Sequence, residues 1–126
     1  MEKLMFQGAH VAQIRIARPT DQLERVVAFY RDGLGLRELG RFEGHAGYDG
    51  VLLGLPGSDY HLELTSHADG SPGPAPTTDN LLVLYLDSRE AAEALAARLA
   101  SRGHPVELRL ELLQVAIPPR TAGQHP

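Results

Sequence analysis

The sequence predicts an α+β fold in which a strand–helix–strand–strand–strand module is followed by a shorter module of the same kind. Apolar residues recur with helical spacing in some segments and with strand-like alternation in others. The order of elements restarts after a segment rich in Gly, Pro and Ser. The 126 residues, 43% of them hydrophobic, suffice for one compact core. We therefore expect residues 1–126 to form a single domain of paired βαβββ modules in a cupped mixed sheet, with the second module incomplete.

The first module is expected to cover about residues 8–66. It begins with a strand at 10–17, where β-branched residues are frequent, and Pro19 is expected to end this strand. A helix follows at 21–33, because its apolar residues recur every three or four positions and Gly33 is a typical residue after a helix end. Three further strands are expected at 36–42, 51–55 and 60–65, with turns at 43–50 and 56–59.

A Gly- and Pro-rich linker is expected at 67–79, before a partial second module at about 80–117. This module should contain a buried strand at 81–86, a helix at 88–102 and a half-buried strand at 106–112, whose apolar and polar residues alternate. The tail at 118–126 begins with two prolines and is expected to be loosely held. Pairing of two modules is physically reasonable, because neither curved half-sheet can cover its own concave face.

The composition excludes several functional classes. The net charge is −4 with no basic cluster, so no nucleic-acid partner is expected. The chain has no cysteine, which rules out disulfides, thiolate metal sites and cysteine catalysis. No apolar run approaches the roughly 20 residues that span a membrane, and the first residues do not resemble a signal peptide. We therefore expect a cytoplasmic protein that does not bind membranes.

Three stretches carry a resemblance to a known superfamily. Gln13 to Pro19, followed by Leu23 to Leu36 with its Phe-Tyr pair and its Leu-Gly-Leu ending, is similar to the opening of many glyoxalase-like proteins. His61 to Thr65 resembles the end of their first module, and Leu81 to Ser88 resembles the start of their second. On these residues the chain is identified as a member of the vicinal oxygen chelate superfamily, which includes glyoxalase I, bleomycin-resistance proteins and extradiol dioxygenases.

The resemblance implies a divalent metal such as Ni, Zn, Fe or Mn, bound by two ligands from each module. Gln13 and Glu63 fall on the two positions of the first module. Leu81 falls on the third position with Asn80 beside it, and leucine cannot bind a metal. The fourth position lies after a turn that this sequence lacks. A shifted reading frame or a truncated gene would produce such a C-terminal ending. We therefore expect this chain to bind no metal tightly.

Strand alternation groups the candidate site residues. Gln13 and Arg15 should lie on one face of the first strand, and His61 and Glu63 on one face of the fourth. Glu63 is either a catalytic metal ligand or a polar residue lining a solvated cleft. Arg15 can hold an anionic substrate or pair with Glu63. His61 is either a third ligand or general base, or a half-exposed strand histidine.

Two functional classes follow from these expectations. The first is a metal-dependent lyase of the glyoxalase type or a dioxygenase, in a degenerate form, with the metal as Lewis acid. The second is a metal-free protein that sequesters a drug or metabolite. In either class Tyr48 is a candidate ligand contact, although its position in a glycine-rich segment favours a plain surface turn. A homodimer is expected, because an incomplete second module leaves an exposed sheet edge.

Overall fold

The computed structural model describes residues 5–6, 8–77, 79–104 and 106–118 of the chain. Two short antiparallel strands, β1 (Met5–Phe6) and β2 (Ala9–His10), form a small hairpin before the first sheet. The tail predicted at 118–126 lies outside the described residues from 119 onward. None of the described helices is long and apolar enough to cross a membrane.

The first sheet has four strands in the order β3-β6-β5-β4. β3 runs parallel to β6, whereas β6, β5 and β4 are antiparallel neighbours, so the sheet is mixed as predicted. β3 is an edge strand and can therefore end at Pro19. Proline has no N–H group, but on the open side of an edge strand no neighbouring strand needs that hydrogen bond. The strands are β3 (Ile14–Pro19), β4 (Arg37–His45), β5 (Tyr48–Gly54) and β6 (Tyr60–His67).

The predicted helix at 21–33 is present as α1 (Leu23–Val27), which continues into the π-helical segment η1 (Ala28–Gly33). The hydroxyl of Thr20 accepts a hydrogen bond from the Gln22 N–H at 3.0 Å and holds the chain entering the helix. Val27 and Phe29 are fully buried, because the apolar stripe of this helix packs on the sheet and on the second half of the chain.

The second half of the chain forms a three-stranded sheet in the order β7-β9-β8 with one helix. The hydroxyl of Ser88 accepts a hydrogen bond from the Ala91 N–H at 3.1 Å, so it is the N-cap that starts the helix near the predicted residue. The elements are β7 (Leu82–Tyr85), α2 (Arg89–Ser101), β8 (Glu107–Arg109), the 3₁₀ turn η2 (Leu110–Leu112) and β9 (Gln114–Ile117).

The predicted strand at 106–112 is wrong beyond Arg109. The chain instead turns through η2 and Leu113, which has a left-handed backbone with φ of 54°, and returns as β9 between β7 and β8. All residues of β9 are buried. β7 is consequently an edge strand and is only half-buried, although its apolar run predicted a buried strand. The second half therefore has three strands where the sequence predicted two.

Two boundaries of the first half are also corrected. The glycine-rich stretch 43–50 is strand at both ends, and only Ala46 and Gly47 form the turn between β4 and β5. Gly44 has a left-handed backbone with φ of 61°, at the point where the register shifts between Phe42 and His45, and Gly50 pairs with Phe42 in the ladder. The strand predicted from residue 10 begins at Ile14, because Ala9 and His10 pair with β1 instead.

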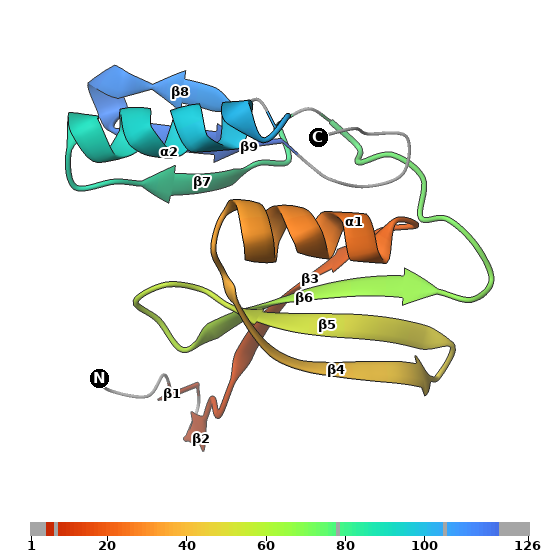
Figure 1. Cartoon of the computed structure of the whole chain (residues 1–126). Coiled ribbons are helices and arrows are strands. Elements are labelled where there is room, and N and C mark those ends of the chain that lie inside the picture. Colours follow the sequence, from red (N-terminus) through yellow and green to blue (C-terminus); the bar gives the residue numbers. More distant parts are fainter. Residues whose placement is uncertain (1–4, 7, 78, 105, 119–126) are drawn as a thin grey trace.

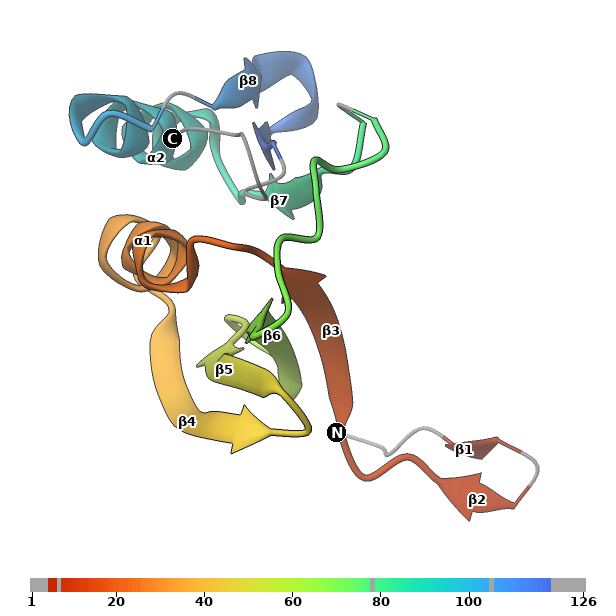
Figure 2. The ribbon, with the colours of Figure 1, turned by 90° about the vertical axis from the view of Figure 1, so that its right-hand side faces the viewer.

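In Figure 1, α1 lies between the first sheet and the second half of the chain, and α2 lies against the second sheet. Arg98 of α2 donates hydrogen bonds to the backbone oxygens of Asp32 and Gly33, so α2 also contacts η1. Figure 2 shows α2 directly above α1 and the curvature of the first sheet. One core cluster joins the halves, since Leu62 and Leu64 of β6 and Val115 and Ile117 of β9 belong to it. The opposite face of the first sheet is the concave face, and it remains accessible.

Candidate functional site

The concave face of the first sheet carries a cavity of about 740 Å³. The residues of β6 alternate so that Leu62 and Leu64 are buried in the core, whereas Glu63 lies on the cavity side. Residues of both edge strands, β3 and β4, line this one cavity, which means that the sheet curves around it. The lining residues are Arg15, Ala17, Pro19, Phe42, His45, Ala46, Tyr48, Glu63 and Thr65.

Four of the predicted site residues form a continuous hydrogen-bonded row. Arg15 Nη1 donates to Glu63 Oε1 at 3.0 Å, and Arg15 Nε donates to Gln13 Oε1 at 2.8 Å. Because the amide oxygen of Gln13 faces Arg15, its NH₂ group faces His61, and Nε2 lies 3.2 Å from His61 Nδ1. In this arrangement Nδ1 is the acceptor, so a neutral His61 carries its proton on Nε2.

The parallel pairing of β3 with β6 explains why these side chains meet. Arg15 is opposite His61 in the ladder, and Ala17 is opposite Glu63. The small side chain of Ala17 leaves room for the Arg15 guanidinium to reach diagonally to Glu63. The side chains of Arg15 and Glu63 are 41% and 19% exposed, so the pair remains within reach of a ligand in the cavity.

The other side of the cavity is aromatic. The ring of Phe42 lies directly on Gly50 of β5, since a Cβ atom at Gly50 would come within 2.2 Å of the ring. Tyr48 is 43% exposed and packs edge-on against His67, with ring centroids 4.4 Å apart. The predicted ligand contact Tyr48 is therefore on the cavity wall, at the end of the hairpin between β4 and β5.

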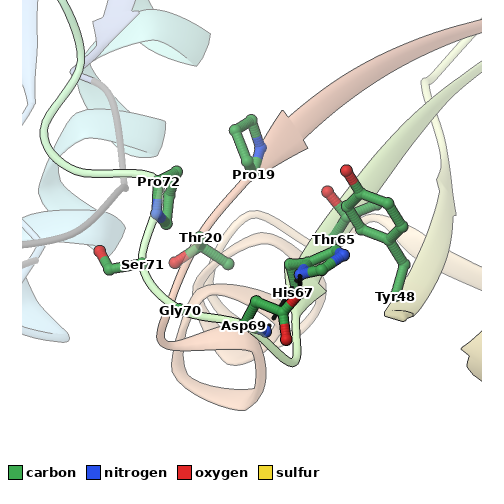
Figure 3. Close-up of a pocket in the computed structure, with 9 residues that line it drawn as sticks. All are labelled: Pro19, Thr20, Tyr48, Thr65, His67, Asp69, Gly70, Ser71 and Pro72. Carbon is green, nitrogen blue, oxygen red and sulfur yellow. Dashed lines mark hydrogen bonds and ion pairs between the residues drawn. The ribbon is translucent and has the colours of Figure 1, made fainter. Parts of the chain in front are cut away.

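A smaller side hollow of about 320 Å³ adjoins the cavity and shares Pro19, Tyr48 and Thr65 with it. Figure 3 shows Tyr48, Thr65 and His67 along one side, with the loop after β6 on the other. His67 Nδ1 accepts a hydrogen bond from the Asp69 N–H at 3.0 Å, which fixes the orientation of the ring. The loop residues that complete the hollow are Asp69, Gly70, Ser71 and Pro72.

His61 differs from the other candidates, because it lines a separate hollow near the start of β6, beside Leu39 and Gly54. It contacts the row through Gln13 but does not line the large cavity. Sequence reasoning missed Phe42, His45 and His67. The alternation that places Glu63 and Thr65 on one face continues to His67 and could have identified it. No such signal exists for Phe42 and His45, because register shifts interrupt β4 on both sides of the segment 40–42.

The residues at the metal-ligand positions of the resemblance do not fit a metal as they stand. Gln13 Oε1 and Glu63 Oε1 each accept a hydrogen bond from Arg15. Asn80, beside the third position, accepts a hydrogen bond from the Thr77 N–H at 3.1 Å. Among the described residues, no three His, Asp or Glu side chains are grouped as a metal site would require.

Comparison with known proteins first defines the class of fold to which this chain belongs. Glyoxalase I of Leishmania major superposes with a TM-score of 0.58 at 19% identity, covering 79% of this chain and 71% of that one, and this likeness shows the fold. The mixed cupped sheet and the recognised stretches identify the chain as a member of the vicinal oxygen chelate superfamily.

The particular family follows from a closer relative. Residues 14–65 match the YycE-like N-terminal domain. The uncharacterised protein YycE of Bacillus subtilis is 46% identical over 99 residues, which are 79% of this chain and 71% of the relative. The crystal structure of a YycE protein from Bacillus subtilis, described there as of unknown function and as a candidate glyoxalase or fosfomycin resistance protein, gives a TM-score of 0.72 at 45% identity, covering 81% and 74%. This chain belongs to the YycE-like family.

Proposed function

We propose that this protein binds a small organic molecule in the concave cavity and does so without a metal ion. The observation that carries the proposal is the cavity itself, which joins an accessible hydrogen-bonding pair, Arg15 and Glu63, to an aromatic wall of Phe42 and Tyr48. Its volume of about 740 Å³ lies in the range of roughly 300–1,000 Å³ that is usual for small-molecule sites.

The polar pair supports a ligand that carries oxygen atoms next to a flat apolar part. In the described part of the chain, Arg15 Nη2 and Glu63 Oε2 have no hydrogen-bond partner, so a donor and an acceptor stand side by side at the cavity. Arg15 would hold a carboxylate or carbonyl oxygen of the ligand, while Phe42 and Tyr48 would contact its flat part.

The alternative is a metal-dependent lyase or dioxygenase, in which Glu63 would be a catalytic metal ligand. The likeness to glyoxalase structures favours this alternative at the level of fold. The side chains at the candidate positions disfavour it, because a metal would first have to displace Arg15 from Gln13 and Glu63. A small-molecule partner, a homodimer and a cytoplasmic location remain proposals for this chain.

An NMR titration with aromatic carboxylates, for example benzoate and 2-naphthoate, tests the proposal. We expect backbone amide shifts to concentrate in 15–18, 42–48 and 63–65, and to weaken in Arg15→Gln and Tyr48→Ala. Arg89→Gln is the matched control, because Arg89 is also paired with a glutamate, at 2.9 Å, but lies on α2. Shifts that map outside the cavity, or none with either compound, would refute the proposal as stated.

A further inference from the structure

One guanidinium group bonds both oxygen atoms that the superfamily resemblance places at metal-ligand positions. Arg15 Nε lies 2.8 Å from Gln13 Oε1, and Arg15 Nη1 lies 3.0 Å from Glu63 Oε1. A zinc ion bound to a carboxylate oxygen lies only about 2.0–2.2 Å away. An ion coordinated by both oxygens would therefore occupy the space that the N–H groups of Arg15 occupy now.

The same guanidinium also keeps a nitrogen donor engaged. Since Arg15 holds the amide oxygen of Gln13, the amide NH₂ is turned toward His61 and lies 3.2 Å from Nδ1. His61 and Glu63 are two residues apart on β6 and share a face, which spaces them about 7 Å along the strand. Without Arg15, Gln13 Oε1 and Glu63 Oε1 would lose the donor that holds them. The Gln13 amide could then turn away from His61 Nδ1, so that two oxygen donors and one nitrogen donor would become available to a divalent ion.

We propose that the Arg15 guanidinium is the resident cation of the concave cavity, standing in place of a divalent metal ion and preventing Gln13, His61 and Glu63 from binding one. Its positive charge balances Glu63 as a metal would, but it cannot be lost to a chelator and has no open coordination position. It therefore offers a ligand oxygen a hydrogen bond from Nη2 instead of a Lewis acid. Replacing this one residue should uncover a metal site.

Isothermal titration of the purified full chain with ZnCl₂ and with NiCl₂ tests the inference. Arg15→Met keeps most of the aliphatic stem and removes the charge. We expect it to bind at least one of the two ions at one site per chain, at least about tenfold more tightly than the unaltered protein, a difference of roughly 1.4 kcal/mol. Arg15→Met/Glu63→Gln should lose this gain, because the carboxylate ligand is gone.

Arg89→Met is the control, since Arg89 is an exposed arginine paired with Glu93 at 2.9 Å on α2. Arg89→Met removes the same charge as Arg15→Met but at a residue that does not line the cavity, so it should leave the metal affinity unchanged. If Arg15→Met lacks a cooperative thermal melt, Arg15→Gln takes its place in the same titrations.

Three outcomes would overturn the inference: equal affinity of the unaltered protein and the folded Arg15 variant, a gain that survives Glu63→Gln, or an equal gain in Arg89→Met. The metal titration needs no organic ligand. A failure to find a ligand for the cavity would refute the proposed function and leave this inference standing.

Discussion

At the scale of single residues, Arg15 and Glu63 are joined by an ion pair that water can reach. Such pairs contribute about 1 kcal/mol or less to stability, because water screens the charges and the side chains lose freedom. We expect Glu63→Gln to change the free energy of unfolding by about 0.5 kcal/mol or less, since the amide oxygen still accepts a hydrogen bond from Arg15. Urea denaturation checks this, and a loss of several kcal/mol would mean that Glu63 holds the two strands together.

Gly50 has a specific role in shaping the cavity wall. A methyl group there would meet the Phe42 ring at 2.2 Å, so Gly50→Ala must displace the ring from the sheet. We expect a loss of about 1–3 kcal/mol in the free energy of unfolding, as overpacking typically costs, together with weaker binding of aromatic carboxylates. Thermal melts and the NMR titration measure the two effects.

Gly54 in the same strand provides the control for this substitution. A methyl group at Gly54 would meet Leu39 at 3.5 Å, which is an ordinary van der Waals contact. Gly54→Ala should therefore leave stability and ligand shifts nearly unchanged. If both variants behave alike, the Phe42–Gly50 contact does not shape the cavity.

At the scale of elements, the hairpin between β4 and β5 has an unfavourable turn residue. Ala46 and Gly47 form a two-residue turn with φ of 52° and 86°, and alanine adopts a positive φ only at a cost. Asparagine tolerates this conformation, and Asn-Gly is the preferred pair in such turns. We expect Ala46→Asn to stabilise the protein by about 0.5–1 kcal/mol in urea denaturation.

The second position of this turn should respond in the opposite direction. Gly47→Ala would place a methyl group 2.8 Å from His67 Nε2 in a backbone conformation that alanine resists, and should destabilise the hairpin. Equal stability of the Ala46→Asn variant and the unaltered protein would show that the strain at Ala46 is relieved in solution.

β4 is fastened to the first helix by an ion-pair network around Glu38. Arg41 donates to Glu38 at 2.9 Å, Arg31 of η1 donates to it at 2.8 Å, and Arg41 also pairs with Glu24 of α1. The hydrogen bonds from Arg41, and then from Arg31, lower the pKa of the Glu38 carboxyl to about 2 from its ordinary value of 4.5. The charged carboxylate is therefore favoured in the folded state.

The lowered pKa of Glu38 predicts a pH dependence of stability. A carboxyl group with a lower pKa in the folded state contributes stability above its unfolded pKa and loses it as the pH falls. The contribution of Glu38 should be complete above about pH 4.5 and should disappear as the pH falls toward 2. We expect Glu38→Gln to destabilise the protein at pH 7 and to do so progressively less between pH 4.5 and 2. Urea denaturation over this range tests it, and a pH-independent difference would contradict it.

At the scale of the whole molecule, we expect a homodimer. The second sheet has three strands rather than the two that the sequence predicted, so fewer strands are missing from the second module than expected. The edge strands β3, β4, β7 and β8 nevertheless each have one side without a neighbour among the described strands. Such edges favour association. Light scattering at micromolar concentration should give twice the mass of one chain, and a monomer with a cooperative melt would contradict this.

Much of the fold was predictable because it depends on local spacing. The apolar stripe of the first helix, the start of the second helix near residue 88 and the alternation around Glu63 are each readable within a few residues, and the structure has them where they were expected. β9 was not readable in this way. Its four buried residues follow a left-handed turn at Leu113, and only pairing with β7 and β8 makes them a central strand.

The candidate site likewise has features that local sequence determines and features that depend on the tertiary structure. The sequence by itself determined the superfamily, the strands that carry Arg15, His61 and Glu63, and the face of each strand on which they lie, because all of these depend on residue type and on a period of two. Gln13 was expected on the first strand but lies just before β3, which begins at Ile14. Only the tertiary structure decided that Arg15 bonds both Gln13 and Glu63, and that Phe42 and Tyr48 face them across one cavity. Those relations depend on the parallel register of β3 with β6 and on the curvature of the sheet, which bring together residues that are far apart in the chain.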